Sequence, residues 1–396
     1  MRGEVDRHAP ADLCRRGVIA GIAAIPLLSV SAPAAVQAPI VGKIVLEDNR
    51  VWVGVTVGGK PPVLFVLDTG AVVSIVQKSY VERLGLKRGG HTRLVGVGGA
   101  QDFTLYEGRD VVFGGAIRQP IAVFAVPDQD LGLARDAAGL LAAGLLTSLD
   151  TDLDFEAGEW RVYPSGRPDR KGFREVSSQI RPSTPAARGS EYIYVEVELD
   201  GRSYQLVADT GFPGQISLFG DATRRSGLWN VERPFSPMQV DGIGGKSSRG
   251  RLVRASRVEL GSIGFDRPLV SLSQDNHHRG RVDGLIGLEL FERLTLSTDV
   301  AKNRLWAKPN GRPARPERHG LSGLWLDDRG GRIVVAEVSP ASLAAEAGLR
   351  EGDEILGGTL RQWIGHLAGK PGDRIEFALR RKGVETKAVL MLRAFL

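Results

Sequence analysis

Two stretches of the sequence, FVLDTGAVVSIV at residues 65–76 and YQLVADTGFPGQISL at residues 204–218, carry the same short pattern. In each stretch the tripeptide Asp-Thr-Gly follows three apolar residues, and its aspartate is Asp68 or Asp209. A carboxylate among apolar residues is costly unless it is paired or neutralised. At average residue usage, two such tripeptides would arise by chance with odds on the order of one in a thousand or rarer. The pattern therefore indicates an internal duplication.

The repeat continues downstream of each aspartate. A glycine-rich turn follows in both halves, flanked by alternating apolar and polar residues that predict a β-hairpin. Similar closing segments follow at residues 138–164 and 283–309, each with an apolar run and a predicted strand pair. We therefore predict two copies of one β-rich lobe, at residues 39–165 and 189–309. The stretch between them, residues 166–188, is rich in proline, glycine, serine and charge, which predicts a surface linker.

Two Asp-Thr-Gly loops brought together about a pseudo-two-fold axis would place both carboxyl groups in one site. Like charges cannot both ionise cheaply there, so the pair would hold one proton between them. Such a pair can activate a water molecule, one carboxylate taking its proton while the other donates to a substrate carbonyl. Glycine permits the close approach, and a threonine hydroxyl can hold the neighbouring loop. The predicted catalytic residues are Asp68 and Asp209, supported by Thr69, Gly70, Thr210 and Gly211.

These motifs resemble bacterial retropepsin-like and pepsin-like aspartic proteases, in the form with two lobes fused in one chain. The resemblance covers roughly residues 40–309 and is carried by FVLDTGA, LVADTG and the Leu285-Ile286-Gly287 run. It implies a mainly β, bilobal aspartic-protease β-barrel fold with internal duplication, and hydrolysis of a peptide or protein substrate without a metal or other cofactor. It also implies that the glycine-rich hairpins are flaps that close over substrate. The predicted flap residues are Gly96, Val97, Gly98 and Gly99 in the first lobe and Gly242, Ile243, Gly244 and Gly245 in the second.

Two positions depart from the family's pattern. Phe212 follows the second motif where the family more often has alanine, serine or threonine, and Ala142 stands where glycine is common. The alternative interpretation is that both aspartates cap turns through local hydrogen bonds in an inert β scaffold. The protein would then be a catalytically inactive peptide-binding or scaffold protein of the bacterial cell envelope.

The last part of the chain, after a short linker at residues 310–319, differs from the two lobes. Residues 320–396 predict a helix at 340–347 and strands at 374–380 and 386–392. In that order, with the stretch SPASLAAEAGLREGDEIL, they resemble a PDZ domain, an α+β fold that binds a peptide C-terminus by strand addition. The resemblance implies a peptide-binding loop at Gly323, Leu324, Trp325 and Leu326. A PDZ-like fold that only packs against the lobes is the alternative.

The N-terminus predicts export. Arg15 and Arg16 precede an apolar run at residues 17–30 and a small-residue stretch, which is typical of a signal peptide. The paired arginines loosely match a twin-arginine signal. Removal of residues 1–38 would take away Cys14, the only cysteine, and leave a periplasmic or secreted protein with no later membrane-spanning segment.

Composition excludes several classes of function. The 396 residues are 42% hydrophobic and 25% charged, which is typical of a globular protein, and 51 glycines favour turn-rich β structure. The net charge of +6 reflects in part basic residues gathered between the lobes, which predict a solvated surface and no nucleic-acid binding. These are Arg161, Arg167, Arg170, Lys171, Arg174 and Arg181. No metalloprotease or serine-hydrolase motif occurs.

Overall fold

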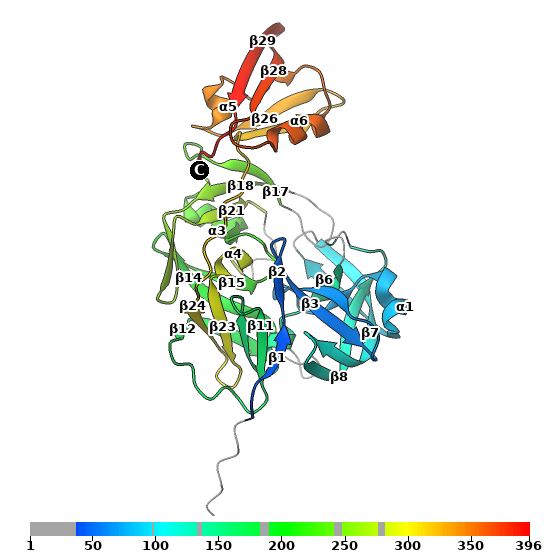
Figure 1. Ribbon diagram of the computed structural model, residues 1–396. Coiled ribbons are helices and arrows are strands. Elements are labelled where there is room, and N and C mark those ends of the chain that lie inside the picture. Colours follow the sequence, from blue (N-terminus) through cyan, green and yellow to red (C-terminus); the bar gives the residue numbers. More distant parts are fainter. Residues whose placement is uncertain are drawn as a thin grey trace, which may run out of the picture. The chain divides into compact units, whose positions relative to one another are not determined.

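The computed structural model describes residues 37–96, 99–131, 133, 137–182, 190–240, 248–275 and 282–396. In these ranges the chain forms four β-sheets and short helices (Figure 1), which confirms the predicted mainly β class. The predicted signal peptide lies outside the described residues up to position 36. No helix in the described ranges is long and apolar enough to cross a membrane.

The N-terminal lobe is an eight-stranded sheet in the order β2-β3-β4-β9-β5-β8-β7-β6. Strand β3 pairs with both β4 and β7, so six of these strands close into a barrel. Alternate side chains of β3 (RVWVGVTV) are buried, as expected for a strand with one face on a core. The elements are β2 (Val45–Glu47), β3 (Arg50–Val57), β4 (Val63–Leu67), β5 (Ile75–Val76), a 3-10 turn (Lys78–Tyr80), α1 (Val81–Leu84), β6 (Lys87–Gly96), β7 (Gly99–Phe113), β8 (Ile117–Pro127), β9 (Ala137–Leu141) and α2 (Gly144–Thr147).

The C-terminal lobe repeats this plan in a ten-stranded sheet, in the order β17-β18-β21-β16-β22-β15-β14-β19-β20, with β13 also paired to β14. In both lobes the strand before Asp-Thr-Gly runs parallel to a later apolar strand, β4 to β9 and β15 to β22. The elements are β13 (Ser178–Pro182), β14 (Ser190–Leu199), β15 (Arg202–Asp209), β16 (Ile216–Phe219), α3 (Gly220–Ser226), β17 (Ser236–Val240), β18 (Ser248–Arg254), β19 (Arg257–Leu260), β20 (Ile263–Asp266), β21 (Leu269–Ser273), β22 (Gly284–Gly287) and α4 (Leu288–Phe291).

A six-stranded sheet joins the lobes, in the order β1-β11-β10-β23-β24-β12. Its centre is the antiparallel pair β10 and β23, with Leu153 opposite Leu296, and the strands on either side of this pair mirror one another. One continuous apolar core extends through both lobes. The elements are β1 (Ile40–Lys43), β10 (Asp150–Asp154), β11 (Glu159–Tyr163), β12 (Arg174–Val176), β23 (Leu294–Asp299) and β24 (Arg304–Pro309).

The segment predicted as a surface linker, residues 166–188, is in part structured, so this prediction was wrong over residues 174–182. Strand β12 adds to the edge of the six-stranded sheet beside β24, and β13 pairs with β14 of the C-terminal lobe. Both strands are short and complete an existing sheet edge. Their pairing therefore depends on a partner strand that the local composition does not reveal. Residues 183–189 lie outside the described part.

The predicted solvated basic surface is also wrong for three of its arginines. Arg167 pairs with Asp152 at 3.0 Å, and Arg161 pairs with Asp154 at 3.0 Å. Arg170 pairs with Asp150 at 2.8 Å and donates to the Thr298 carbonyl at 2.6 Å. Arg170 also contacts Asp299 of β23, at 3.3 Å.

The pairs of Arg170 join segments from both lobes. The side chains of Arg170 and Asp150 are each 12% exposed, so this is a largely buried pair. Burial by itself raises the pKa of Asp150. Amide donors from Arg167 and Val300, with the Arg170 guanidinium, outweigh that effect and hold this pKa below its ordinary value.

Replacing Arg170 by methionine is expected to lower the free energy of unfolding by about 2–4 kcal/mol at neutral pH, because two largely buried carboxylates lose their cation. The depressed pKa of Asp150 contributes stability above its unfolded value that is lost as the pH falls. The loss of unfolding free energy caused by the substitution should therefore be smaller at acidic pH. Denaturant unfolding measures it, with Lys171→Met as the control, since Lys171 is exposed in the same segment. An equal loss of stability in the two variants would show that the ion pairs of Arg170 do not stabilise the protein.

The linker at residues 310–319 has no helix or strand, yet it is held against both lobes. The Gly311 amide donates to Glu156 at 3.1 Å, and Arg315 contacts Asn49 of the first lobe. Arg315 also pairs with Glu292 of the second lobe, whose side chain is fully buried. This segment therefore fixes the start of the following domain relative to the lobes.

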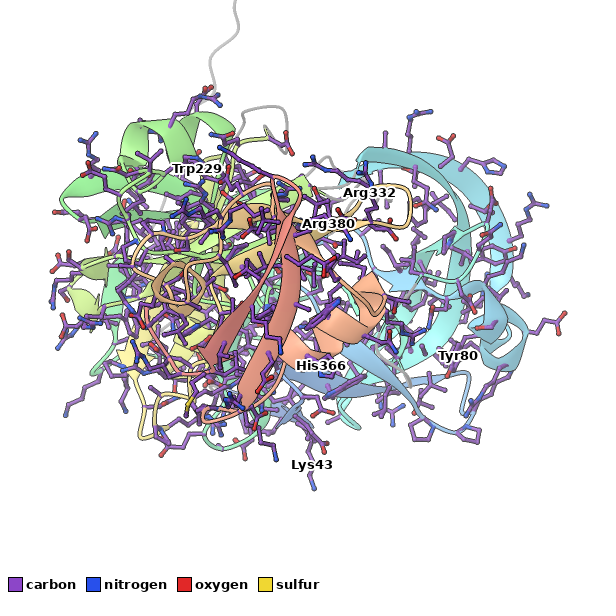
Figure 2. The ribbon with its side chains drawn as sticks, turned by 90° about the horizontal axis from the view of Figure 1, so that it is seen from above. Lys43, Tyr80, Trp229, Arg332, His366 and Arg380 are labelled. Atoms are coloured by element: carbon purple, nitrogen blue, oxygen red, sulfur yellow. The ribbon has the colours of Figure 1, made fainter. Side chains whose placement is uncertain are left out.

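The tail domain, residues 320–396, has a sheet in the order β25-β26-β27-β28-β29 and its own apolar core. Trp363 of α6 stacks on Phe377 of β28 with ring centroids 5.0 Å apart. Figure 2 shows His366 on the same helix and Arg380 on β28. The elements are β25 (Leu324–Asp328), β26 (Ile333–Val338), α5 (Leu343–Glu346), β27 (Glu354–Ile355), α6 (Leu360–Leu367), β28 (Arg374–Arg381) and β29 (Val384–Met391).

The tail domain contacts the β17–β18 hairpin of the C-terminal lobe. The Arg251 guanidinium pairs with Glu337 of β26, and each of these side chains is 13% exposed. The same guanidinium lies 3.9 Å from the ring centroid of Phe235 and 4.5 Å from that of Trp229. The Phe235 amide donates to the Ser339 hydroxyl at 2.8 Å. A largely buried charge pair whose cation also lies close to two aromatic rings is a specific contact.

Candidate active site

The two Asp-Thr-Gly loops begin where a buried strand ends. Strand β4 leads to Asp68, whose amide donates to the Leu141 carbonyl of β9 at 2.8 Å. Strand β15 ends at Asp209, which lies opposite Gly287 of β22. Each aspartate is thus placed by a parallel strand pair inside its own lobe. The apolar triplet before each motif supplies the buried strand.

The threonines of the two loops bind reciprocally across the interface between the lobes. The Thr69 amide donates to the Thr210 hydroxyl at 3.1 Å, and the Thr210 amide donates to the Thr69 hydroxyl at 2.9 Å. Each hydroxyl then donates to a carbonyl of the other lobe, Thr69 to Ala208 at 2.6 Å and Thr210 to Leu67 at 2.7 Å. Both side chains are buried, at 2% and 1% exposure. Four hydrogen bonds therefore lock the loops together.

The glycines of both motifs allow the carboxyl groups to approach. A methyl group on Gly70 would overlap the Asp209 carboxyl group, and one on Gly211 would overlap the Asp68 carboxyl group. Each glycine thus lies directly against the aspartate of the opposite lobe. Any larger residue at these positions would force the carboxyl groups apart.

The structure brings Asp68 and Asp209 together as one pair. Each carboxyl group lies against the glycine of the opposite motif, and at this proximity both groups cannot ionise cheaply. Asp68 is half-buried and Asp209 is 8% exposed. Burial raises the pKa of both groups, and for Asp68 the charge of Asp209 raises it further.

The surroundings of the two carboxyl groups differ. Asp209 Oδ1 accepts hydrogen bonds from the amides of Gly211, at 2.8 Å, and Phe212, at 3.1 Å. Asp68 Oδ1 accepts one, from the Gly70 amide at 3.0 Å. Amide donors favour the ionised form, so they oppose the effect of burial on the pKa of Asp209 more than on that of Asp68. The pKa of Asp68 is therefore raised more than that of Asp209, so a proton shared by the pair would rest mainly on Asp68.

The two departures from the family pattern fit this geometry. Ala142 and Gly287 occupy equivalent positions in the two lobes. Gly287 of β22 lies opposite Asp209, and Ala142 comes directly after Leu141 of β9, which lies opposite the residue before Asp68. In the first lobe the carbonyl of the small residue Ala71 accepts a hydrogen bond from the Ala143 amide. In the second lobe the bulky Phe212 lies against Gly287, where a methyl group would overlap its ring. The large Phe212 is thus combined with Gly287, and the small Ala71 with Ala142. Each lobe has room for the residue that follows its Asp-Thr-Gly motif.

The predicted flaps are described only at their bases. Gly96 and Gly99 face one another at the ends of β6 and β7, while Val97 and Gly98 lie outside the described residues. The second predicted flap lies between β17 and β18, and its residues Gly242, Ile243, Gly244 and Gly245 also lie outside them. The flap assignment therefore stays a prediction.

The residues predicted to bind peptide in the tail domain lie at the start of β25, on a different sheet from the aspartates. Gly323 has a positive φ of 71°. Leu324 and Leu326 are buried in the core of the tail domain. The Leu324 amide donates to the Ser322 hydroxyl at 3.2 Å, so this donor is already paired within the loop.

Trp325, the third of these four residues, faces the C-terminal lobe. Its indole N–H donates to Asp327 at 2.9 Å, and the Arg249 guanidinium of β18 lies 5.1 Å from its ring centroid. Arg249 also pairs with Asp327 at 3.0 Å. Trp325 therefore packs against the neighbouring lobe.

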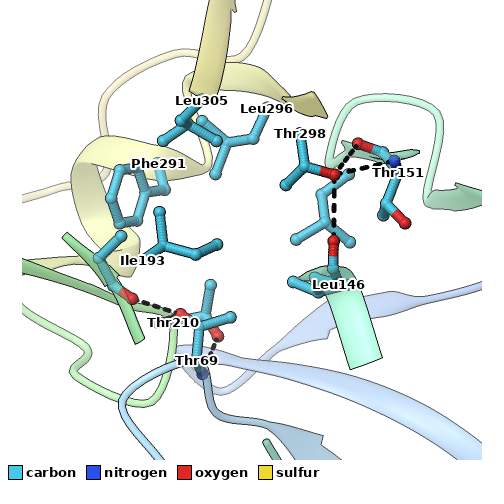
Figure 3. Close-up of a pocket in the computed structure, with 11 residues that line it drawn as sticks. Thr69, Leu146, Thr151, Ile193, Thr210, Phe291, Leu296, Thr298 and Leu305 are labelled. Carbon is cyan, nitrogen blue, oxygen red and sulfur yellow. Dashed lines mark hydrogen bonds between the residues drawn. The ribbon is translucent and has the colours of Figure 1, made fainter. Parts of the chain in front are cut away.

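A small cavity lies behind the threonine hydrogen bonds. Thr69 and Thr210 form one of its walls, opposite apolar side chains that include Phe291, Leu296 and Leu305 (Figure 3). Its volume is about 20 Å³, and both threonine hydroxyls are paired to carbonyls. Apolar side chains therefore surround the hydrogen-bonded threonines on the side of this cavity. Within the described residues, no group of three or more histidine, cysteine, aspartate or glutamate side chains could hold a metal ion.

Sequence reasoning missed the residues that share the sheet face with the aspartates. Arg50 and Trp52 lie on β3 of the N-terminal lobe, and Tyr192 and Tyr194 lie on β14 of the C-terminal lobe. They stand far from the motifs in sequence, and only strand pairing brings them close. Their offsets from the aspartates differ by one residue between the lobes, 18 for Arg50 and 17 for Tyr192, so a search for equal offsets would not have found them.

A family model matches part of the first lobe. Residues 53–146 match the family model described as Aspartyl protease, a range that contains Asp68 and ends within α2. Among solved structures, the chain is similar to the crystal structure of aspartic proteinase from Irpex lacteus, at 14% identity and a TM-score of 0.47. That similarity covers 69% of this chain and 98% of the other. No curated protein matches. The family match supports a protease activity.

Proposed function

We propose that the protein is an aspartic endopeptidase in which Asp68 and Asp209 activate a water molecule to hydrolyse a peptide bond. The observation that carries this proposal is the close approach of the two carboxyl groups, which reciprocal threonine hydrogen bonds hold in place. The match of residues 53–146 to aspartyl proteases supports it independently of the side-chain geometry.

The asymmetry of the pair assigns the roles. Asp209, with two amide donors, is the better carboxylate and acts as general base, while Asp68 carries the proton and acts as general acid. Asp209 takes a proton from the water molecule while the water oxygen bonds to the carbonyl carbon of the peptide. Asp68 protonates the carbonyl oxygen. Asp209 then gives its proton to the amide nitrogen. One hydroxyl of the tetrahedral intermediate returns its proton to Asp68 as the C–N bond breaks.

This mechanism predicts a bell-shaped dependence of kcat/KM on pH. Activity is lost in acid when Asp209 becomes protonated, and lost at higher pH when Asp68 ionises. Because burial raises the pKa of both aspartates, we expect both limbs of the profile to lie at pH values above the pKa of an isolated aspartate. Cleavage of an unfolded protein by residues 39–396, followed across pH by mass spectrometry, measures the profile.

Two outcomes would overturn the proposal. Cleavage that keeps rising at pH values far above the acidic range would require another catalytic group. Absence of cleavage at every pH, in a protein whose circular dichroism shows a folded state, would favour a non-catalytic peptide-binding module.

The tail domain and export belong to the same proposal. We assign the tail a peptide-binding or regulatory role, supported by the order of its helix and strands, which resembles a PDZ domain, and by its charge pairs with the β17–β18 hairpin. Export to the periplasm or outside the cell rests on the basic and apolar pattern of residues 15–38. The N-terminal residue of the protein recovered from cells tests it, because processing should remove the apolar run.

A further inference from the structure

Strand register places matching pairs of residues beside the two aspartates. Trp52 of β3 lies opposite Val66 of β4, and Tyr194 of β14 lies opposite Val207 of β15. Each valine stands two residues before its aspartate, so it shares the face of the sheet that carries the carboxyl group. Trp52 and Tyr194 are therefore equivalent residues on that face.

The same alternation extends one step towards the carboxyl groups. Arg50 stands two residues before Trp52, and Tyr192 stands two residues before Tyr194, so these two are also equivalent. Duplication has thus given the same position a cation in the first lobe and a phenol in the second. The two sides of the carboxyl pair differ in chemistry.

The second lobe presents an aromatic surface here. Tyr192 and Tyr194 meet edge to face, with ring centroids 5.8 Å apart, and with Phe212 they pack against the cluster that contains Val207. Such a surface favours apolar or aromatic substrate side chains. In the first lobe Trp52 packs against the cluster that contains Val66, and Arg50 adds a charge beside it.

Arg50 has no carboxylate partner within salt-bridge distance among the described residues. Its side chain donates one hydrogen bond within the described ranges, from Nη1 to the Asn49 carbonyl at 3.1 Å. By contrast, the half-buried Arg167, Arg170 and Arg251 are all paired. The charge of Arg50 reaches the site, because it lowers the pKa of Asp68 against the larger effect of burial. A half-buried guanidinium with spare donors favours a bound carboxylate.

We propose that Arg50 is a specificity-determining residue that selects an acidic side chain of the peptide substrate on the N-terminal-lobe side of the carboxyl pair. This inference rests on the proposed endopeptidase function. It goes beyond that function by naming a substrate class: peptides with glutamate or aspartate near the cleaved bond on one side, and an apolar or aromatic residue on the other.

The test uses a set of quenched fluorescent peptides built on a sequence that the protein cleaves. A single glutamate is moved through each position within four residues of the cleaved bond, and each peptide has a glutamine twin. We expect one position at which glutamate raises kcat/KM about tenfold over glutamine, as for a hydrogen bond to a charged group. The ratio within one enzyme variant cancels any change in the carboxyl pair itself.

Variants then assign the preference to Arg50. Arg50→Gln should bring the glutamate-to-glutamine ratio close to one, and Arg50→Glu should favour a lysine peptide at the same position. Arg50→Lys keeps the charge and should keep part of the preference, which covers the case in which the glutamine variant fails to fold. Arg109→Gln, at an exposed position on β7, is the matched control and should keep the full ratio.

The outcomes separate this inference from the proposed function. Equal cleavage of every glutamate and glutamine twin, with Asp68→Asn inactive, overturns the inference and leaves the protease proposal standing. A preference that survives in Arg50→Gln overturns it as well. Cleavage that persists in Asp68→Asn overturns the proposed function itself.

Discussion

Asp68→Asn is expected to reduce kcat/KM for peptide cleavage by about 10³-fold or more, because an amide can neither give up nor accept the proton that the mechanism moves. Asp209→Asn should have an effect of similar size, since each carboxyl group acts in both halves of the reaction. Steady-state kinetics with one fluorescent peptide measures both. The aspartates belong to one unit, so the double substitution should cost little more than either single one.

Stability measurements distinguish lost chemistry from lost folding. The pKa of Asp68 is raised on folding, so the folded state holds its proton more tightly than the unfolded chain does. The associated stability is fully present below the unfolded pKa and is lost as the pH rises through the folded value. Asparagine does not titrate. The melting temperature of Asp68→Asn should therefore match the wild type in acid and exceed it as the pH approaches neutrality.

Asp209→Asn provides the matched comparison. Two amide donors already stabilise its carboxylate, so its substitution should raise the neutral-pH melting temperature less than that of Asp68 does. The reverse order would contradict the assignment of the proton to Asp68. Wild-type kcat/KM in a folded Asp68→Asn variant would remove the aspartate pair from the mechanism.

Thr69→Val is expected to lower the free energy of unfolding by about 2–5 kcal/mol and to reduce cleavage strongly. Valine has nearly the same shape but no hydroxyl, so the Thr210 amide and the Ala208 carbonyl lose their partner in a buried interface. Each unsatisfied buried group costs about 1–3 kcal/mol. Because these bonds join the two lobes, their loss also loosens the placement of both carboxyl groups.

Thr69→Ser is the control for this prediction, since serine keeps the hydroxyl and removes one methyl group. Urea unfolding and kcat/KM should place serine close to the wild type and valine far below it. Equal values for the two variants would show that packing, and not the hydrogen bonds, holds the loops together.

The duplication, the position of both aspartates and the mainly β class could be predicted because they depend on local pattern. An apolar triplet before Asp-Thr-Gly signals a buried strand that ends in a tight loop wherever it occurs. The tail strands predicted at 374–380 and 386–392 agree with β28 and β29 within two residues or so, because period-two alternation is also local.

The segment 174–182 could not be predicted in this way. Strands β12 and β13 are short and carry mixed polar residues, and each forms because a sheet edge stands ready to pair with it. The arginines of that region likewise find aspartates of β10 and β23 that are remote in sequence. Composition described these residues as exposed, and tertiary pairing buried them.

The sequence by itself determined that this protein has two similar lobes, each presenting one aspartate at the end of a buried strand. Only the tertiary structure decided that Asp68 is the better holder of the shared proton, because amide donors to each carboxyl group come from loop geometry. It also decided that Arg50 and Tyr192 occupy matching places beside the pair. Strand register sets which distant residues become neighbours, and no local pattern specifies it.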